Sequence, residues 1–231
     1  MGFLRSYGPL IVLLSTGTAF SFWWLLHFAM GMHLQKLAIA IISVLHTVIG
    51  LFSVLLFGYL ETGNPGSMSL YGGVFIMPLY YLLLVKATKN KSAVVFDIMT
   101  FCLVGTVFCA RINCIISGCC YGISFFGSQT LRWPTREMEL LFYFAIAVTV
   151  GRKVWKNPGK VHAYPLYMMC YGAFRFITEF LRFSSTHTVF HRGHLWSAIA
   201  FCLGASIYFT LRSREAFANK NTHRKREMKN G

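Results

Sequence analysis

Long apolar stretches separated by short polar segments run along most of the 231-residue chain. A stretch of about 20 apolar residues is long enough to cross a bilayer as a helix. The pattern therefore predicts an all-α polytopic membrane protein with about seven transmembrane helices. We expect these helices near residues 7–28, 37–60, 71–87, 93–111, 137–151, 163–182 and 194–212.

The segment 112–136 does not fit this pattern, because it is rich in Gly, Cys and Ser and contains Trp133-Pro134. Irregular backbone is tolerated at membrane depth only where protein or water surrounds it. We therefore expect an irregular outer or re-entrant segment between the fourth and fifth helices. The chain is predicted to form one transmembrane bundle domain, residues 1–212, and a basic cytoplasmic tail, residues 213–231. The N-terminal apolar run lacks a small-x-small cleavage site, so we expect it to be the first helix.

Composition supports a membrane protein, since 55% of residues are hydrophobic, 16% are aromatic and only 13% are charged. The net charge of +15 does not indicate nucleic-acid binding. The cations lie mostly in short segments between apolar stretches and in the tail from Arg212 to Lys229. There they suit membrane topology and anionic lipid, so we expect membrane lipids and no nucleic acid as partners.

The distribution of lysine and arginine predicts the orientation. With the N-terminus outside, every lysine falls in a cytoplasmic segment or the tail, and the outer segments and polar stripe hold arginine alone. The positive-inside rule therefore favours an N-out, C-in topology. Because the planar guanidinium suits bound phosphate or carboxylate, we expect the chemistry on the outer side.

Four polar residues form a stripe within the sixth apolar stretch. At 100° per residue, Tyr171, Arg175, Glu179 and Arg182 fall within roughly 80° of one another on a helix. Ionised groups at bilayer depth cost about 2.5–3.5 kcal/mol each, so they must be paired and turned away from lipid. Such a stripe is typical of a phosphate or carboxylate site. The structural alternative is an Arg175–Glu179 pair that only locks helices together.

A second candidate runs from Arg111 to Gly122. Arg111 ends a predicted helix, and Gly118 and Gly122 would let backbone amides approach a ligand. The adjacent pair Cys119 and Cys120 admits thiol redox chemistry, although small residues packing a tight turn explain it equally well. No metal site is expected, because no His or carboxylate stands at ligand spacing.

Three weaker candidates lie elsewhere. Gly72 and Gly73 follow Tyr71 at a helix start, where an anion or a simple turn would fit. Glu139 lies about one turn inside a helix that begins near Pro134, so its charge needs a partner. Asp97 is expected to be structural. Of the histidines, His194 in the last outer segment is the candidate for acid–base chemistry.

In this order, the segments resemble the prolipoprotein diacylglyceryl transferase family. The most specific match is 171–182, which resembles the family's Tyr-Gly, Arg, Glu, Arg signature. Arg111, Gly118 and Gly122 match its Arg-x-Gly-Asn-x-x-Asn-Gly-x-x-x-Gly segment. Further matches are Tyr7 in the first helix and Arg132, Pro134 and Glu139 in the Arg-x-Pro-x-x-x-x-Glu element.

The chain departs from the family pattern at several positions. Tyr71 stands where the family has a histidine before Gly-Gly. Cys114 and Ser117 replace the two signature asparagines, and Cys119 replaces a glutamate. The resemblance therefore indicates a diverged member.

The resemblance implies transfer of the diacylglyceryl group of phosphatidylglycerol to the lipobox cysteine thiol of a preprolipoprotein, in the bacterial cytoplasmic membrane. Arg111 and Arg175 would hold the phosphate, Glu179 would orient Arg175, and Arg182 would shape the outer mouth. Tyr7, Tyr71 and Tyr171 would donate hydrogen bonds to the head group. A thiol with a pKa of about 8.5 needs little help to ionise, and no metal or soluble cofactor is implied.

Two other functions remain open from the residues alone. The first is transfer of a phospholipid-derived group to another acceptor, which the Tyr71 and Cys119-Cys120 departures favour. The second is a non-enzymatic lipid or anion carrier, which would need polar residues to continue to the inner face.

Overall fold

The computed structural model describes residues 2–116, 122–124, 132–182, 190 and 192–230. Its described part is helical and contains no β-strand, only isolated bridges between Gly122 and Arg182 and between Ser124 and Arg132. The elements are α1 (Gly2–His27), α2 (Lys36–Thr62), α3 (Tyr71–Phe75), α4 (Met77–Thr88), α5 (Ser92–Ile116), α6 (Thr135–Ile146), a π-helical turn η1 (Ala147–Gly151), α7 (Arg152–Lys156), α8 (Ala163–Glu179) and α9 (Arg192–Asn230).

Helices occur at all seven predicted positions. Among the described residues, five segments are long and apolar enough to cross a membrane. These are Leu10–His27, Lys36–Thr62, Tyr71–Thr88, Ser92–Ile116 and Arg192–Ala218. The 17 residues of α8 span only about 26 Å, less than the hydrocarbon core, and α6 starts with charged residues. These long apolar helices indicate a multi-pass membrane protein. The seven crossings and the N-out, C-in orientation stay predictions.

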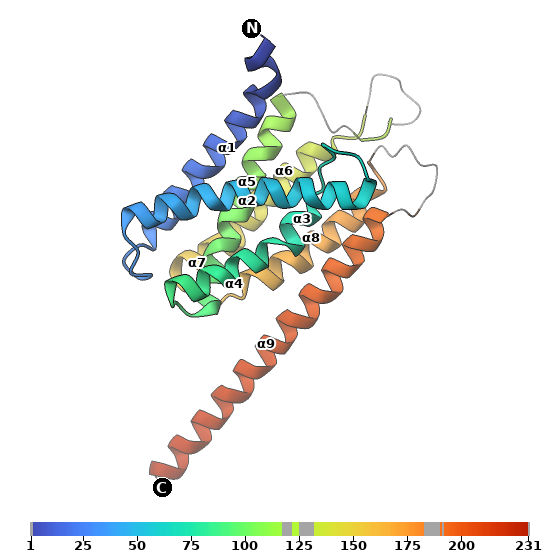
Figure 1. Cartoon of the computed structure of the whole chain (residues 1–231). Helices are drawn as coiled ribbons and strands as arrows, with labels where there is room; N and C mark the ends of the chain where they lie inside the picture. The colour runs from blue at the N-terminus through green and yellow to red at the C-terminus, as the bar shows by residue number, and fades with distance from the viewer. Residues whose placement is uncertain (1, 117–121, 125–131, 183–189, 191, 231) are drawn as a thin grey trace.

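Several predicted boundaries were wrong. The fourth predicted helix does not end at residue 111, because α5 continues to Ile116. The third is broken at Ile76, where α4 begins with Pro78 in its first turn. The sixth ends at Glu179 rather than 182. The last helix continues through the predicted tail as one 39-residue helix, whose end projects away from the bundle (Figure 1).

Asp97 fixes the start of α8 against α5. Its carboxylate accepts hydrogen bonds from the amides of Gly159, Val161 and Ala163 at 2.8, 3.1 and 2.6 Å. The Ala163 amide is one that the first turn of α8 leaves without an intrahelical partner, the other two belong to the turn before the helix, and a carboxylate at this end also suits the helix dipole. Asp97 is 1% exposed, so its predicted structural role is confirmed.

Close backbone packing fixes α8 against α9. A side chain at Gly172 would lie 2.5 Å from the Phe201 amide nitrogen and 2.7 Å from the Ser197 carbonyl oxygen. Glycine is therefore required where the two helices touch, as is common between membrane helices. This contact brings the C-terminal end of α8 beside the first turns of α9.

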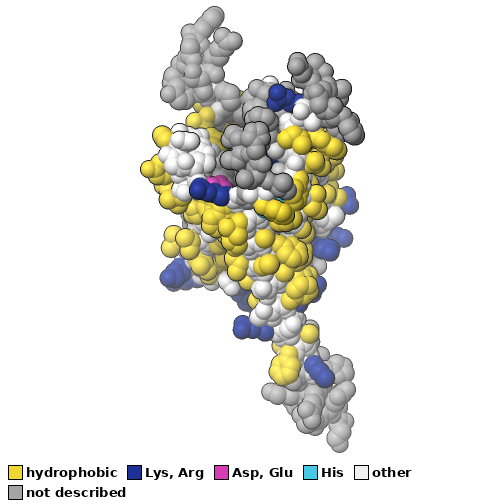
Figure 2. All heavy atoms as spheres, turned by 90° about the vertical axis from the view of Figure 1, so that its right-hand side faces the viewer, with side chains coloured by type: hydrophobic (Ala, Val, Ile, Leu, Met, Phe, Trp, Pro, Cys, Tyr) yellow, Lys and Arg dark blue, Asp and Glu magenta, His cyan; other side chains and the backbone are white. Residues whose placement is uncertain are grey.

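Large apolar side chains lie on the outside of the bundle as well as inside it. Leu37, Phe52, Leu83 and Phe209 are each more than 60% exposed. Figure 2 shows hydrophobic side chains over much of one face, with Lys and Arg gathered toward its lower part. Such a surface is expected of a protein surrounded by lipid.

Candidate functional site

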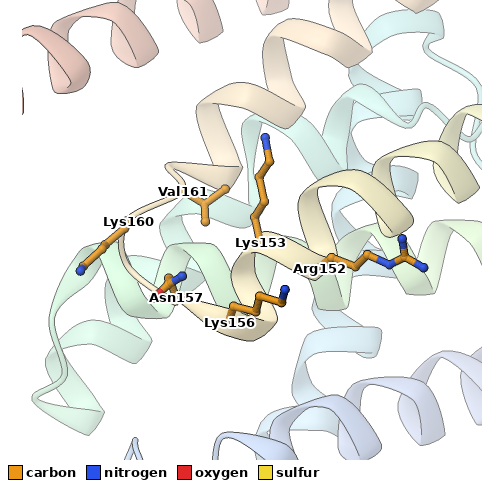
Figure 3. A pocket seen from close by; sticks show the side chains of 6 residues that line it. All are labelled: Arg152, Lys153, Lys156, Asn157, Lys160 and Val161. Atoms are coloured by element: carbon orange, nitrogen blue, oxygen red, sulfur yellow. The ribbon is translucent and has the colours of Figure 1, made fainter.

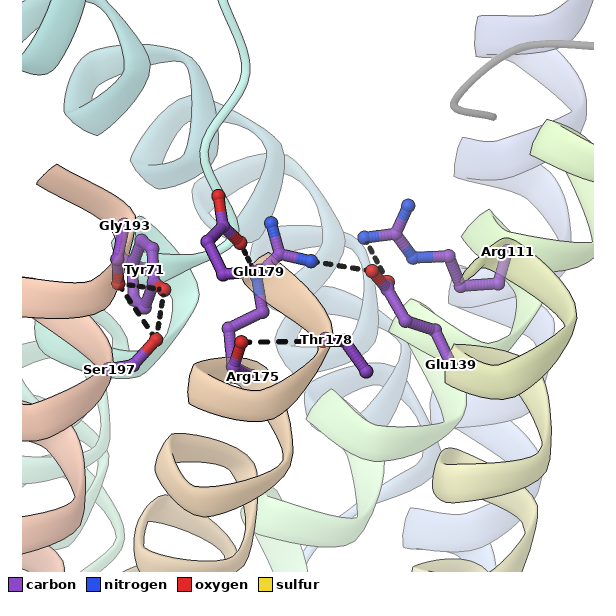
Figure 4. Close-up of polar contacts among 8 residues, drawn as sticks. All are labelled: Tyr71, Arg111, Glu139, Arg175, Thr178, Glu179, Gly193 and Ser197. Carbon is purple, nitrogen blue, oxygen red and sulfur yellow. Dashed lines mark hydrogen bonds and ion pairs between the residues drawn. The ribbon is translucent and has the colours of Figure 1, made fainter. Parts of the chain in front are cut away.

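Two arginines share one carboxylate where α5, α6 and α8 meet (Figure 4). Arg175 Nη1 lies 2.5 Å from Glu139 Oε1, and Arg111 Nη2 pairs with the other oxygen, Glu139 Oε2. Arg175 Nε also lies 3.1 Å from Glu179 Oε2, one turn further along α8. Charges therefore alternate through the chain Arg111–Glu139–Arg175–Glu179, which we call the ion network.

The ion network is buried. Arg111, Glu139, Arg175 and Glu179 are 7%, 3%, 5% and 9% exposed. Buried charges are tolerated only when they are paired, and here two cations meet two anions. Arg111, Arg175 and Glu179 lie near the C-terminal ends of α5 and α8, and Glu139 lies just after the first turn of α6, so all four are at one end of the bundle.

Two hydrogen-bond donors beside this network have no acceptor among the described residues. One is Arg111 Nε and the other is the Tyr171 hydroxyl, one turn before Arg175. Tyr171 is only 1% exposed. A buried donor left unsatisfied costs about 1–3 kcal/mol, so an acceptor that reached either donor would be stabilised.

Tyr71 connects α3 to the start of α9. Its hydroxyl donates to the Gly193 carbonyl oxygen at 2.8 Å and lies 2.6 Å from Ser197 Oγ. The Tyr71 and Tyr171 rings are 5.9 Å apart in a T-shaped arrangement. Ser197, which the sequence did not single out, is thus a polar neighbour of the candidate site, and its partner lies 126 positions away in the chain.

The glycines after Tyr71 pack against protein. A side chain at Gly72 would lie 1.9 Å from the Ser53 carbonyl oxygen, so α3 packs directly on α2. Gly73 faces the Leu103 side chain, with a contact of 3.5 Å for an added Cβ. Their predicted roles in substrate binding stay predictions.

Arg182 does not lie on the helical stripe with the other three residues. Because α8 ends at Glu179, Arg182 follows it in a turn and forms a bridge with Gly122. The Gly122 amide donates to the Trp133 carbonyl oxygen at 3.1 Å, and the Ile123 amide donates to Leu181 at 2.9 Å. This irregular segment therefore pairs with the end of α8, which the periodic pattern alone could not reveal.

His194 lies in the first turn of α9 and is 3% exposed. Its ring centroid is 4.3 Å from that of Phe180, 5.2 Å from Phe176 and 5.3 Å from Phe190.

Tyr7 lies on α1, but its side chain is outside the described part of the chain. Gly118, Cys119 and Cys120 are outside the described residues altogether.

Within the ranges that the structure describes, no three His, Cys, Asp or Glu side chains gather as metal ligands. Of the described cysteines, those at positions 102, 109, 170 and 202 are free thiols.

Fold and site together define a helical membrane protein with a buried ion network at one end of the bundle. A family model described as prolipoprotein diacylglyceryl transferase matches residues 4–210. The chain belongs to this transferase family, as the signature segments indicated. Comparison with curated proteins and with solved structures finds no match.

Proposed function

We propose that the chain transfers the diacylglyceryl group of phosphatidylglycerol to the lipobox cysteine thiol of preprolipoproteins in the bacterial cytoplasmic membrane. The observation that carries this proposal is the buried Glu139 carboxylate shared by Arg111 and Arg175. It holds two guanidinium groups together at one end of the bundle. Arg111 Nε has no acceptor among the described residues, so it can donate to a ligand. Guanidinium groups arranged in this way suit the phosphate of a lipid head group.

In the proposed reaction, the thiol sulfur attacks the glyceryl carbon that carries the phosphate. A C–S bond forms as the C–O bond breaks, and the electron pair of the broken bond leaves on the phosphate oxygen. Arg111 and Arg175 stabilise the negative charge that develops on this oxygen. The products are the thioether and glycerol phosphate, and the thiol proton is released to the phosphate or to water.

The carboxylates have a positioning role in this proposal. Glu139 fixes the distance between the two guanidinium groups, and Glu179 holds the Arg175 side chain through Nε. Tyr71 and Tyr171 offer hydroxyl groups to the head group, and Arg182, Gly122 and His194 are the further residues that we propose for substrate binding. With the N-terminus outside, as the lysine distribution favours, the ion network faces the outer leaflet, where lipobox cysteines are modified.

The test is an assay with purified protein, phosphatidylglycerol and a lipobox peptide. The wild-type protein should convert the peptide thiol to a thioether and release glycerol phosphate, and Arg175→Ala should not. Arg212→Ala is the control, since Arg212 is an exposed arginine on α9 far from the ion network. Peptide left unmodified by the wild-type protein would refute the proposal.

A second candidate is transfer of the same group to a different acceptor. The observation that favours it is Tyr71, which stands at the family's histidine position and whose hydroxyl is bonded to Gly193 and Ser197. Expression in cells depleted of their own transferase distinguishes the two. Rescue of growth supports the preprolipoprotein acceptor, whereas phosphatidylglycerol turnover without rescue supports the second candidate.

A further inference from the structure

A basic hollow lies at the opposite end of α6–α8 from the ion network. It has a volume of about 390 Å³ and is lined by Arg152, Lys153, Lys156, Asn157, Lys160 and Val161. We call it the basic pocket. Figure 3 shows its long cationic side chains extending from α7 and from the turn that leads into α8.

The positive charge of the basic pocket is not compensated by neighbouring carboxylates. In the described part of the chain, none of its four cations forms an ion pair. The carboxylate of Asp97 lies beneath this turn, but three backbone amides already occupy it. The Glu215 carboxylate, on α9, pairs with His162 Nε2 at 2.9 Å and not with a cation of the pocket. A hollow surrounded by unpaired cations attracts an anion, and flexible lysine and arginine side chains can close around it.

The backbone of the pocket is nevertheless fixed in place. The three hydrogen bonds to Asp97 anchor the turn from Gly159 to Ala163, and Val154 on α7 is fully buried. The charged side chains therefore project from a rigid frame rather than from a free loop. This arrangement lowers the cost of gathering them around one ligand.

Trp155 on α7, together with tryptophans of α1, indicates that the pocket lies at the depth of lipid head groups. Trp155 stacks on His27 with ring centroids 3.4 Å apart, and Trp24 and Trp23 lie 5.3 and 6.0 Å away. Tryptophan gathers at the boundary between hydrocarbon and water. An anion that reaches this pocket is therefore most readily supplied by a phospholipid of the adjacent leaflet.

We propose that the basic pocket binds the phosphate group of an anionic phospholipid, at a site separate from the ion network. Positive-inside topology needs cations only somewhere in this segment, whereas a binding site needs them around one hollow. The volume is in the range of small-ligand pockets and accommodates a head group. The proposal stands whether or not the chain catalyses diacylglyceryl transfer.

The test measures binding of phosphatidic acid to the purified full-length protein in neutral detergent, with phosphatidylcholine of the same chains as reference. One variant combines Arg152→Gln, Lys153→Gln, Lys156→Gln and Lys160→Gln. Its matched control removes equal charge from α9 through Arg212→Gln, Arg214→Gln, Lys220→Gln and Arg224→Gln. We expect Kd to rise at least about tenfold for the pocket variant and less than about twofold for the control. Equal losses in both variants, or no loss in either, would overturn the proposal.

A third variant, Asn157→Trp, covers the case in which charge removal impairs folding or insertion. Asn157 is an exposed lining residue, so tryptophan fills the hollow and leaves every charge in place. Phosphatidic acid should bind this variant at least about tenfold more weakly, and unchanged binding would contradict the proposal.

Competition with millimolar glycerol phosphate then identifies the source of the phosphate group. Displacement of the lipid indicates that a soluble phosphate also binds, and no displacement indicates a membrane lipid.

Discussion

Glu139 Oε1 accepts a 2.5 Å hydrogen bond from Arg175 Nη1 and thereby joins the start of α6 to the end of α8. The same carboxylate pairs with Arg111 on α5, so one side chain connects three helices. Without Glu139, Arg111 would keep no carboxylate partner among the described residues, and Arg175 would keep only Glu179.

Glu139→Gln should strongly destabilise the protein. It removes one negative charge between two buried guanidinium groups, and breaking a buried pair costs about 3–5 kcal/mol. Glu137→Gln is a matched control two residues away. The Glu137 side chain pairs with Arg136 but is 41% exposed, so this substitution should cost about 0–1 kcal/mol. The measurement is thermal unfolding in detergent, and equal shifts in Tm for the two variants would argue against a buried network.

Gly193→Ala should reduce transfer more than it reduces stability. The new methyl group would lie 2.5 Å from Glu179 Oε1, so the flexible Glu179 side chain must move and release Arg175. We expect a stability loss of about 1 kcal/mol and a rate loss of about tenfold. Gly50→Ala is the control, because its nearest neighbour is Met77 Sδ at 4.0 Å. A wild-type rate in Gly193→Ala would show that Glu179 does not position Arg175.

Tyr71→Phe and Ser197→Ala should not be additive. Each removes one end of the 2.6 Å contact between the two hydroxyl groups and should cost about 0.5–1.5 kcal/mol. The double variant should lose less stability than the sum of the two single losses. Unfolding free energies of the four proteins form a double-mutant cycle, and a coupling energy of zero would show that the contact contributes nothing.

Asp97→Asn should loosen the start of α8. The amide side chain keeps only one acceptor oxygen for three backbone amides, so we expect a loss of about 2 kcal/mol or more. Glu215→Gln tests the neighbouring contact with His162, where Glu215 is 42% exposed and a small effect is expected. Hydrogen exchange at Val161 and Ala163 reports the change directly, and unaltered protection would contradict this role.

The sequence was most informative where a local rule applied. Helical spacing placed Tyr171, Arg175 and Glu179 on one buried face, and the cost of burying a charge indicated that Glu139 needs a partner. Neither rule identifies the partner, because Arg111 and Arg175 lie 28 and 36 positions from Glu139. Only the packing of α5, α6 and α8 brings these residues together.

The wrong predictions have physical reasons as well. Phe180 and Leu181 continue the apolar pattern past Glu179, so hydropathy extends the helix to Arg182, whereas backbone pairing with 122–123 ends it. The polar residues after 212 led hydropathy to end the last helix there, but most of them are compatible with a helix and α9 continues through them. Ser197 was missed because its hydroxyl partner is contributed by a distant helix.

The most direct test of the central claim compares transfer rates for Arg111→Lys, Arg175→Lys and the double variant. Lysine keeps the positive charge but loses the planar fork that holds carboxylate and phosphate together. If the two guanidinium groups act as one unit on the phosphate, each single variant should lose about 100-fold or more. The double variant should then be little worse than either single one. A wild-type rate in either single variant would contradict the account, provided that thermal unfolding shows the variant to be folded.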